Sequence, residues 1–208
     1  MLKRIPLVDL NYNLTNIFPV SVHGYSISKF DEIQQQLVDY AYDLEKKDPI
    51  GVEKSNRGGW QSPPFHLNDK DNLLHDILIK SIFSLPTKRD ESLAFDVWAW
   101  VNINRSGAYN AKHIHPNSHL AGVFWIKTPP NSGNIEFTSS YEFVGFEELE
   151  KLYPDEFVEK YNSYRIYYFP PVAGDILIFP SHLQHEVKEN KSDEDRISVS
   201  FNISIKHV

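Results

Sequence analysis

Hydrophobic and polar residues follow two different periods along this chain, and the change of period divides it into two parts. From residue 30 to 47, apolar side chains recur every three or four positions, which predicts a helix capped by Ser28. A second helix is expected at 71–83, with Asp69 as its cap. From residue 93 onward, apolar and polar residues alternate, which is typical of strands.

The second part of the chain contains several strand-sized segments of this kind. The chain has 28 Phe, Trp and Tyr residues, and aromatic residues favour strands. We therefore expect a mainly β fold with flanking helices. The predicted strands cover residues 93–104, 120–127, 133–137, 164–169, 176–179, 186–188 and 196–205.

Two of these strands carry an unusual polar face. In 93–104, Asn102 and Asn104 share a face with two tryptophans, and in 196–205 the polar residues begin with Arg196 and Ser198. The usual interpretation is that a polar face meets solvent. In a small barrel that holds a ligand, the polar face can instead point inward while helices cover the apolar face. The pattern leaves both arrangements open.

The chain is long enough for one domain, and we expect residues 1–208 to form a single unit. In this prediction, residues 1–90 form a helical and loop-rich lead-in that packs on a β barrel, and residues 91–208 form the core of that barrel. An acidic, partly helical insertion occupies about 139–163. This insertion and the segment SNRGGWQS (55–62) are long and irregular, so both are candidate lids over a binding site.

Composition excludes several classes of protein. The absence of cysteine excludes a disulfide scaffold, an iron–sulfur cluster, a zinc ribbon and a thiol nucleophile. The net charge of −7 argues against duplex nucleic acid as a partner. No apolar run approaches the length that spans a bilayer, and residues 1–20 lack the pattern of a signal peptide. We expect a soluble cytoplasmic protein without a membrane partner, and a homodimer stays open.

The histidines are the candidate metal-binding residues. Five of the nine histidines fall between residues 113 and 185, with His113 and His115 two positions apart. Residues at this spacing in a strand point the same way, so both rings can face one metal ion, and His185 lies about 70 residues further on. Imidazole suits Fe, Zn, Cu and Ni, and without thiolates an open catalytic site is favoured. His119 and His182 stay open as ligands.

Two segments resemble the iron- and 2-oxoglutarate-dependent oxygenase superfamily. They are NINRSGAYNAKHIHPNSHLAGVFWI and GDILIFPSHLQHEVKENKSDEDRISVSFNI, with a motif of the form H-x-H-P, F-P-x(4)-H and R-x-S. The resemblance covers about residues 15–205. It implies a distorted double-stranded β-helix, a jelly roll similar to the cupin fold. It also implies an enzyme that uses Fe(II), 2-oxoglutarate and O2 and hydroxylates a substrate, with succinate and CO2 as co-products.

The resemblance also implies roles for individual residues. His113 is the first iron ligand, His185 is the distal ligand, and His115 stands where the superfamily usually has a carboxylate. Arg196, eleven residues after His185, and Ser198 match the pair that holds the far carboxylate of 2-oxoglutarate. An arginine fork suits a carboxylate on physical grounds as well.

The missing carboxylate leaves the third ligand open. His115 completes a three-histidine site, or else Glu136 or a water molecule takes the third position. Asn102, Tyr109 and Asn110 are candidate pocket residues, because of their strand face or their proximity to the H-x-H pair. Trp100 and Trp125 are expected to pack inside the barrel. The substrate class stays open between a small molecule, a peptide and a protein side chain.

Two other functions fit parts of the pattern. A cupin-type metal protein would bind its metal through His113, His115, His119 and His185 and would have no use for Arg196 and Ser198. A binding barrel without catalytic activity is the third class, and whether the protein holds a divalent metal would distinguish it.

Overall fold

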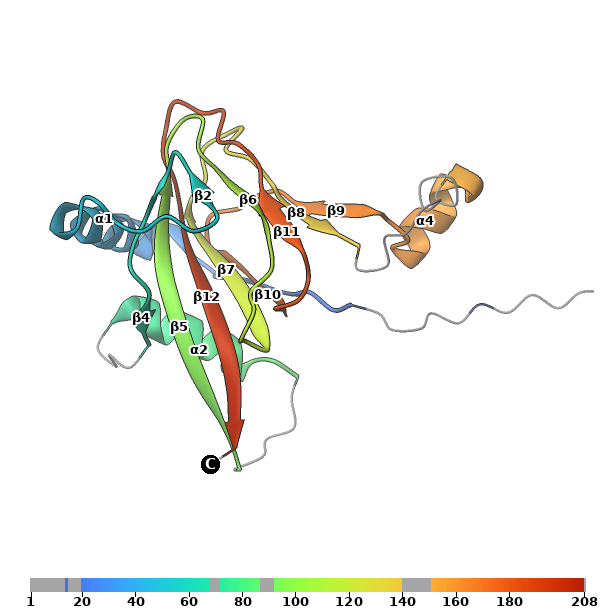
Figure 1. Ribbon diagram of the computed structural model, residues 1–208, viewed down its shortest axis with the longest axis horizontal. Coiled ribbons are helices and arrows are strands. Elements are labelled where there is room, and N and C mark those ends of the chain that lie inside the picture. Colours follow the sequence, from blue (N-terminus) through green and yellow to red (C-terminus); the bar gives the residue numbers. More distant parts are fainter. Residues whose placement is uncertain (1–13, 15–19, 68–71, 87–91, 140–150, 208) are drawn as a thin grey trace, which may run out of the picture.

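The computed structural model describes residues 14, 20–67, 72–86, 92–139 and 151–207, which form two antiparallel sheets with helices (Figure 1). One sheet has seven strands, of which six follow one path and β4 pairs with β5; the other has five strands. In order, the first contains β1 (His23–Ser26), β10 (Asp175–Pro180), β7 (Leu120–Lys127), β12 (Arg196–His207), β5 (Leu93–Asn104) and β3 (Trp60–Gln61), with β4 (Phe65–His66) beside β5. The second contains β2 (Asn56–Arg57), β6 (Tyr109–His113), β11 (His185–Val187), β8 (Ile135–Thr138) and β9 (Ile166–Phe169).

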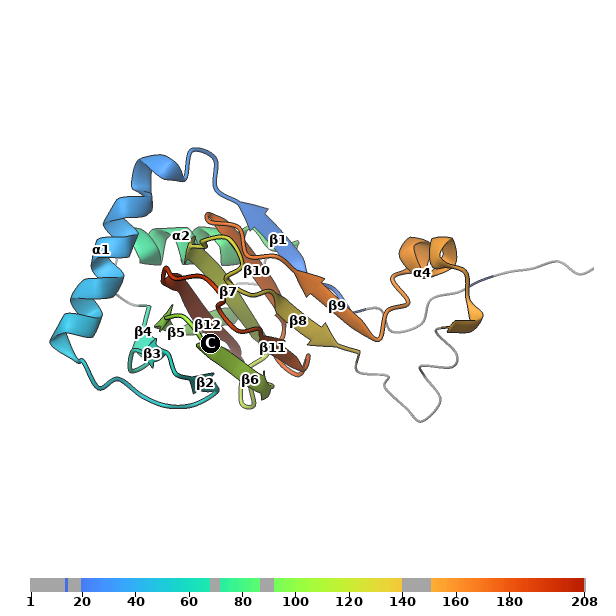
Figure 2. The same ribbon diagram turned by 90° about the horizontal axis from the view of Figure 1, so that it is seen from above.

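Helices α1 (Asp31–Lys47) and α2 (Leu73–Phe83) lie on the seven-stranded sheet, on the side away from the five-stranded sheet (Figure 2). Their buried apolar residues, such as Leu37 and Leu78, belong to one core cluster with Val101 of β5 and Val199 of β12. The predicted amphipathic character of the first helix is therefore confirmed, since its apolar face is buried against the sheet.

A second, smaller core lies between the two sheets. It contains Val123 and Trp125 of β7 together with Ile135 and Phe137 of β8. Because β12 buries its apolar residues under the helices, its polar residues face this inter-sheet space. The inward orientation of the polar face, left open by the sequence pattern, is the one that the structure adopts.

The helix caps differ from the predictions. Helix α1 starts after Phe30 without a side-chain cap, so the prediction of Ser28 as cap is wrong. Helix α2 is capped by Asn72, whose side chain accepts a hydrogen bond from the Leu74 amide at 2.9 Å. The predicted cap Asp69 lies outside the described residues.

The segment 55–62 forms strands rather than an irregular lid. Its residues Asn56–Arg57 pair with β6 of one sheet, and Trp60–Gln61 pair with β5 of the other. The side chain of Asn56 holds the turn between them by donating to the carbonyls of Val52 and Gly59. This segment therefore closes one edge of the inter-sheet space as part of its wall.

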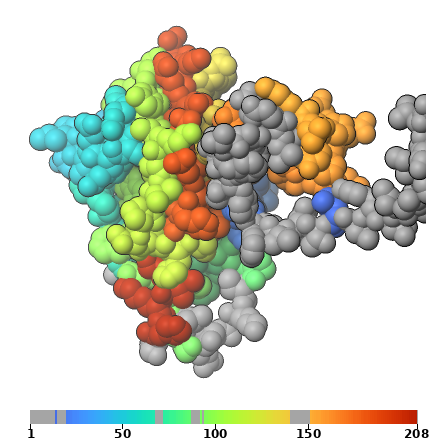
Figure 3. Space-filling model, turned by 45° about the vertical axis from the view of Figure 1, so that its right-hand side comes forward, coloured from blue at the N-terminus to red at the C-terminus, as the bar shows by residue number. Residues whose placement is uncertain are grey.

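The predicted strands of the second half are all present, with ends that differ by a few residues. Of the insertion at 139–163, residues 140–150 lie outside the described part, and the remainder contains α4 (Asp155–Tyr161). In the space-filling view, this part projects beside the body formed by the sheets (Figure 3). None of the described helices has the length and apolar character that a bilayer crossing needs.

Candidate functional site

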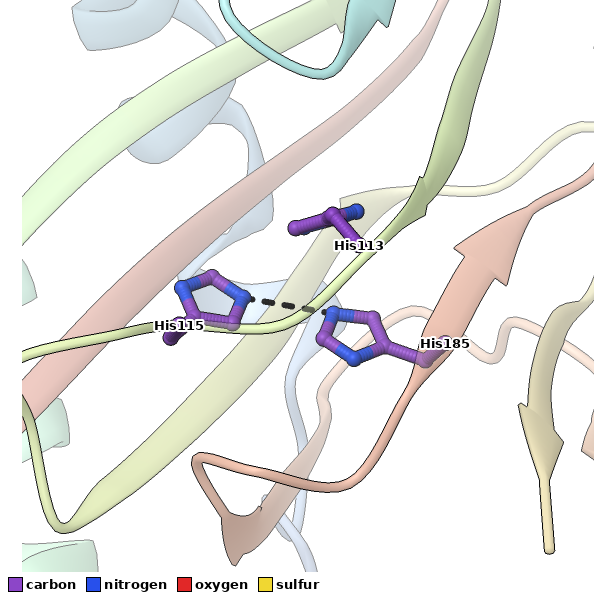
Figure 4. Close-up of side chains that lie close together, drawn as sticks. All are labelled: His113, His115 and His185. Atoms are coloured by element: carbon purple, nitrogen blue, oxygen red, sulfur yellow. Dashed lines mark hydrogen bonds between the residues drawn. The ribbon is translucent and has the colours of Figure 1, made fainter. Parts of the chain in front are cut away.

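Three histidines from separate positions meet between the sheets (Figure 4). His113 ends β6, and His185 begins β11, where the two residues are direct partners across the antiparallel pair. His115 lies two residues beyond β6, and its amide donates to the carbonyl of Ser181 at 2.9 Å. Main-chain pairing thus positions all three side chains, although their sequence separation reaches 72 residues.

The rings are close enough to share one ion. One nitrogen from each histidine can be chosen so that all three lie within 4.8 Å of one another. The Nε2 atoms of His115 and His185 are 3.2 Å apart. Two nitrogens that each lie about 2.1 Å from one ion, at a right angle, are separated by about 3.0 Å.

Hydrogen bonds to the main chain fix the orientation of two of the rings. The carbonyl of Ala111 lies 2.7 Å from Nδ1 of His113, and the carbonyl of Leu183 lies 2.9 Å from Nδ1 of His185. A carbonyl only accepts, so each Nδ1 carries the hydrogen and each Nε2 keeps a free lone pair. Metal-binding histidines commonly use the second ring nitrogen in this way.

The environment keeps all three rings neutral. Burial lowers the pKa of His115 to about 3, and repulsion from His185 and His113 acts in the same direction. Burial also lowers the pKa of His185 to about 4, and it lowers the pKa of His113. Neutral imidazoles are the form that binds metals, so the donor set fits a divalent ion such as Fe(II).

The other candidate ligands lie elsewhere. Glu136 forms an ion pair with Lys188 at 3.1 Å, and its neighbours Ile135 and Phe137 take the inward-facing positions of β8. Nδ1 of His119 accepts a hydrogen bond from the amide of Ile205 at 3.0 Å. Neither side chain belongs to the histidine cluster found among the described residues, so the four-ligand cupin arrangement is not assembled.

Arg196 is a buried cation beside the cluster. Only 1% of the residue is exposed, and it lines the same cavity as the three histidines. Its Nη1 donates to the carbonyls of Ser132, Gly133 and Lys188. Among the described residues it forms no ion pair, and burial lowers the pKa of its guanidinium to about 10.

The loop that holds Arg196 depends on a glycine. Gly133 has a φ of +87°, and a Cβ atom at this position would lie 2.2 Å from the carbonyl oxygen of Lys188. Glycine allows the two stretches of backbone to approach closely. Their carbonyls can therefore surround the guanidinium.

The remaining predicted pocket residues divide into two groups. Ser198, Asn102 and Asn110 line the cavity, and Asn102 and Ser198 are direct partners across β5 and β12. Tyr109 is 42% exposed and lies outside the lining. The reason is a bulge: His185 pairs with His113 but Val187 pairs with Asn110, so one extra residue of β6 turns Asn110 and His113 to the same side.

Two tryptophans have a larger role at the site than their sequence pattern predicts. Trp100 and Trp125 pack inside the barrel as expected, but both also line the cavity. The ring of Trp100 stacks on His115, with centroids 5.8 Å apart and an angle of 28° between the planes. The shared strand face of Trp100 and Asn102 was the signal that could have identified this role. Ser55, the first residue of the segment that the sequence marked as a candidate lid, lines the cavity as well.

The inner cavity is narrow and opens beside a wider groove. The cavity has about 30 Å³ of free space, which is room for about two water molecules. Lining side chains must therefore shift before a five-carbon dicarboxylate can enter. The neighbouring groove has a volume of about 520 Å³, and His113, His115, Trp100 and Ser55 line both spaces.

Two solved structures that resemble this fold are prolyl hydroxylases, although their sequences differ greatly from this chain. A prolyl-4-hydroxylase from Pseudomonas putida has a TM-score of 0.61 at 12% identity, covering 88% of this chain and 91% of its own. A prolyl hydroxylase from Trichoplax adhaerens, solved with a hypoxia-inducible-factor peptide, has a TM-score of 0.59 at 13% identity, covering 88% and 83%. These similarities establish the double-stranded β-helix fold that the sequence predicted.

Family membership comes from the sequence itself. No curated protein matches the chain. The model of a family described as "Putative 2OG-Fe(II) oxygenase" matches residues 98–202, which is half of the chain and contains the three histidines and Arg196. The chain therefore belongs to this family of 2OG-Fe(II) oxygenases.

Proposed function

We propose that this protein is an Fe(II)- and 2-oxoglutarate-dependent oxygenase that hydroxylates its substrate, with succinate and CO2 as co-products. The observation that carries this proposal is the meeting of three neutral imidazoles with a buried arginine that has no carboxylate partner among the described residues. A divalent metal needs the first feature, and a dicarboxylate cosubstrate needs the second.

In this proposal, His113, His115 and His185 hold the iron through Nε2. When bound, iron supplies the activation of O2 that couples decarboxylation of 2-oxoglutarate to oxidation of a C–H bond. The three imidazoles contribute no negative charge, so this site differs in charge from the common arrangement of two histidines and one carboxylate.

The other residues bind and orient the cosubstrate. Arg196 and Ser198 would hold the far carboxylate of 2-oxoglutarate, the guanidinium by charge-assisted hydrogen bonds and the hydroxyl by one more. The buried amide of Asn102, whose Oδ1 has no hydrogen-bond partner within the described part of the chain, lies at the same level of the sheet as Ser198. Trp100 and Trp125 keep this space apolar and exclude bulk water.

The test is an anaerobic titration with Fe(II) followed by 2-oxoglutarate, monitored by visible absorption and by formation of succinate after air is admitted. We expect a charge-transfer band and succinate in the wild-type protein. The variant His185→Ala should lose both, while His182→Ala, an exposed histidine on the same turn, should keep both. A wild-type protein that binds iron but neither shows the band nor forms succinate would contradict the proposal.

A further inference from the structure

The groove beside the histidine cluster has a distinct charge. Three cationic residues, Lys54, Arg57 and Lys112, line it, and no Asp or Glu belongs to its described lining. This concentration of positive charge stands out because the whole chain has a net charge of −7. An anion in this groove would therefore meet a field opposite to that of the protein as a whole.

Most of this charge is not neutralised within the fold. Arg57 has an exposed ion pair with Glu53 at 3.5 Å, and it also donates to the carbonyls of Lys54 and Asn56. Lys54 and Lys112 are exposed, and neither has an ion pair with any residue in the described ranges. Two freely reachable ammonium groups and one anchored guanidinium thus remain for a ligand.

The floor of the groove suits the uncharged part of a molecule. Trp100 lies there against His115, and Ile114 is 45% exposed, which leaves apolar surface uncovered. Asn202 adds a polar side-chain amide to the same lining. The groove therefore offers apolar contact close to the cluster and positive charge around it.

We propose that the substrate of this enzyme is an anion with at least two carboxylate or phosphate groups. These groups bind Lys54, Arg57 and Lys112, and the remainder of the molecule lies over Trp100 and Ile114, with its reacting C–H bond toward the histidines. The statement that this anion is a substrate rests on the proposed function. The binding of anions by the groove does not depend on it.

The experiment measures binding without metal, so that it is independent of oxygenase activity. Fluorescein-labelled hexaglutamate and hexalysine are compared by fluorescence anisotropy, and citrate is titrated by calorimetry, all at low salt. The test variant is Lys54→Glu/Lys112→Glu. The control is Lys46→Glu/Lys80→Glu, which changes the charge equally on exposed positions of α1 and α2.

We expect at least one of the two anions to bind, to bind about tenfold more weakly to the groove variant, and to change less than about twofold in the control. Hexaglutamate binding would indicate an acidic peptide, and citrate binding alone would indicate a small polyanion. Equal binding of hexalysine, equal effects of both variants, or binding of neither anion would overturn the proposal. If the wild-type protein binds an anion here but fails to bind Fe(II) in the titration described under the proposed function, only the proposed function is overturned.

Discussion

At the scale of single residues, the site depends on how the chain satisfies polar groups inside the protein. The carbonyls of Ala111 and Leu183 fix the ring nitrogens of two histidines, and three other carbonyls hold Arg196. The sequence indicated the histidines and the arginine through motif and spacing. It could not indicate their backbone partners, because these depend on which stretches of main chain approach one another.

Replacing Arg196 tests its proposed role as the partner of the cosubstrate. Arg196→Met should weaken 2-oxoglutarate binding about tenfold to a hundredfold, since hydrogen bonds to a charged group contribute about 1.5–3 kcal/mol. Iron binding should change little, because the guanidinium is not part of the histidine cluster. Calorimetry with each ligand measures both effects.

Arg196→Lys is the matched control, since it keeps the charge but loses the fork of donors. It should recover part of the 2-oxoglutarate affinity. If both variants lose iron and 2-oxoglutarate together, Arg196 serves folding rather than cosubstrate binding.

Gly122, which lines the cavity from β7, is expected to be intolerant of a side chain. A Cβ atom there would lie 2.2 Å from the ring of Phe201, which is fully buried in the adjacent strand β12. Gly122→Ala should lower the free energy of unfolding by about 1–3 kcal/mol through overpacking. Urea denaturation measures this.

Gly24→Ala serves as the comparison in β1, where the nearest atom to a new Cβ would be 3.6 Å away. Its effect should stay within about 0.5 kcal/mol. Equal stability of the two variants would show that β7 and β12 are less closely packed than the structure indicates.

At the scale of elements, the positions of the strands were easier to predict than the direction in which their polar faces point. Alternation located β5 and β12, but the same pattern fits a polar face in water or in a cavity. The helices decide between them: α1 and α2 cover the apolar face, so the polar face is left for the second sheet. The bulge in β6 was also beyond the pattern, and it is the reason why Tyr109 points away from the site.

One hydrogen bond between elements leads to a prediction about the pH dependence of stability. The hydroxyl of Tyr42 on α1 donates to Asp195, just before β12, at 2.9 Å, and burial together with this bond raises the pKa of Tyr42 to about 12. The folded state thus holds the proton more tightly than the unfolded chain, whose tyrosine has a pKa near 10. The stabilisation is complete below pH 10 and is lost as pH rises toward 12.

Tyr42→Phe should therefore be less stable than the wild type by about 0.5–1.5 kcal/mol at pH 7. The difference should shrink between pH 10 and pH 12. Denaturant unfolding across this range provides the measurement. A constant difference would show that the hydrogen bond to Asp195 does not control the ionisation of Tyr42.

At the scale of the whole molecule, the two sheets have different roles. The seven-stranded sheet and its helices form the larger core, and the five-stranded sheet supplies two of the histidines near its middle. The resemblance of short motifs was enough to predict the double-stranded β-helix and the three histidines. The charge of the groove was not predictable, because Lys54 and Lys112 are 58 residues apart and are brought together by the pairing of β2 with β6.

The central claim is that His113, His115 and His185 hold one divalent metal ion. Anomalous diffraction from crystals grown anaerobically with Fe(II), recorded on both sides of the iron absorption edge, tests this directly. We expect one strong peak about 2.0–2.2 Å from a nitrogen of each of the three rings. A peak at any other position with the cluster empty, or a peak that touches only two of these rings and a carboxylate, would contradict the account.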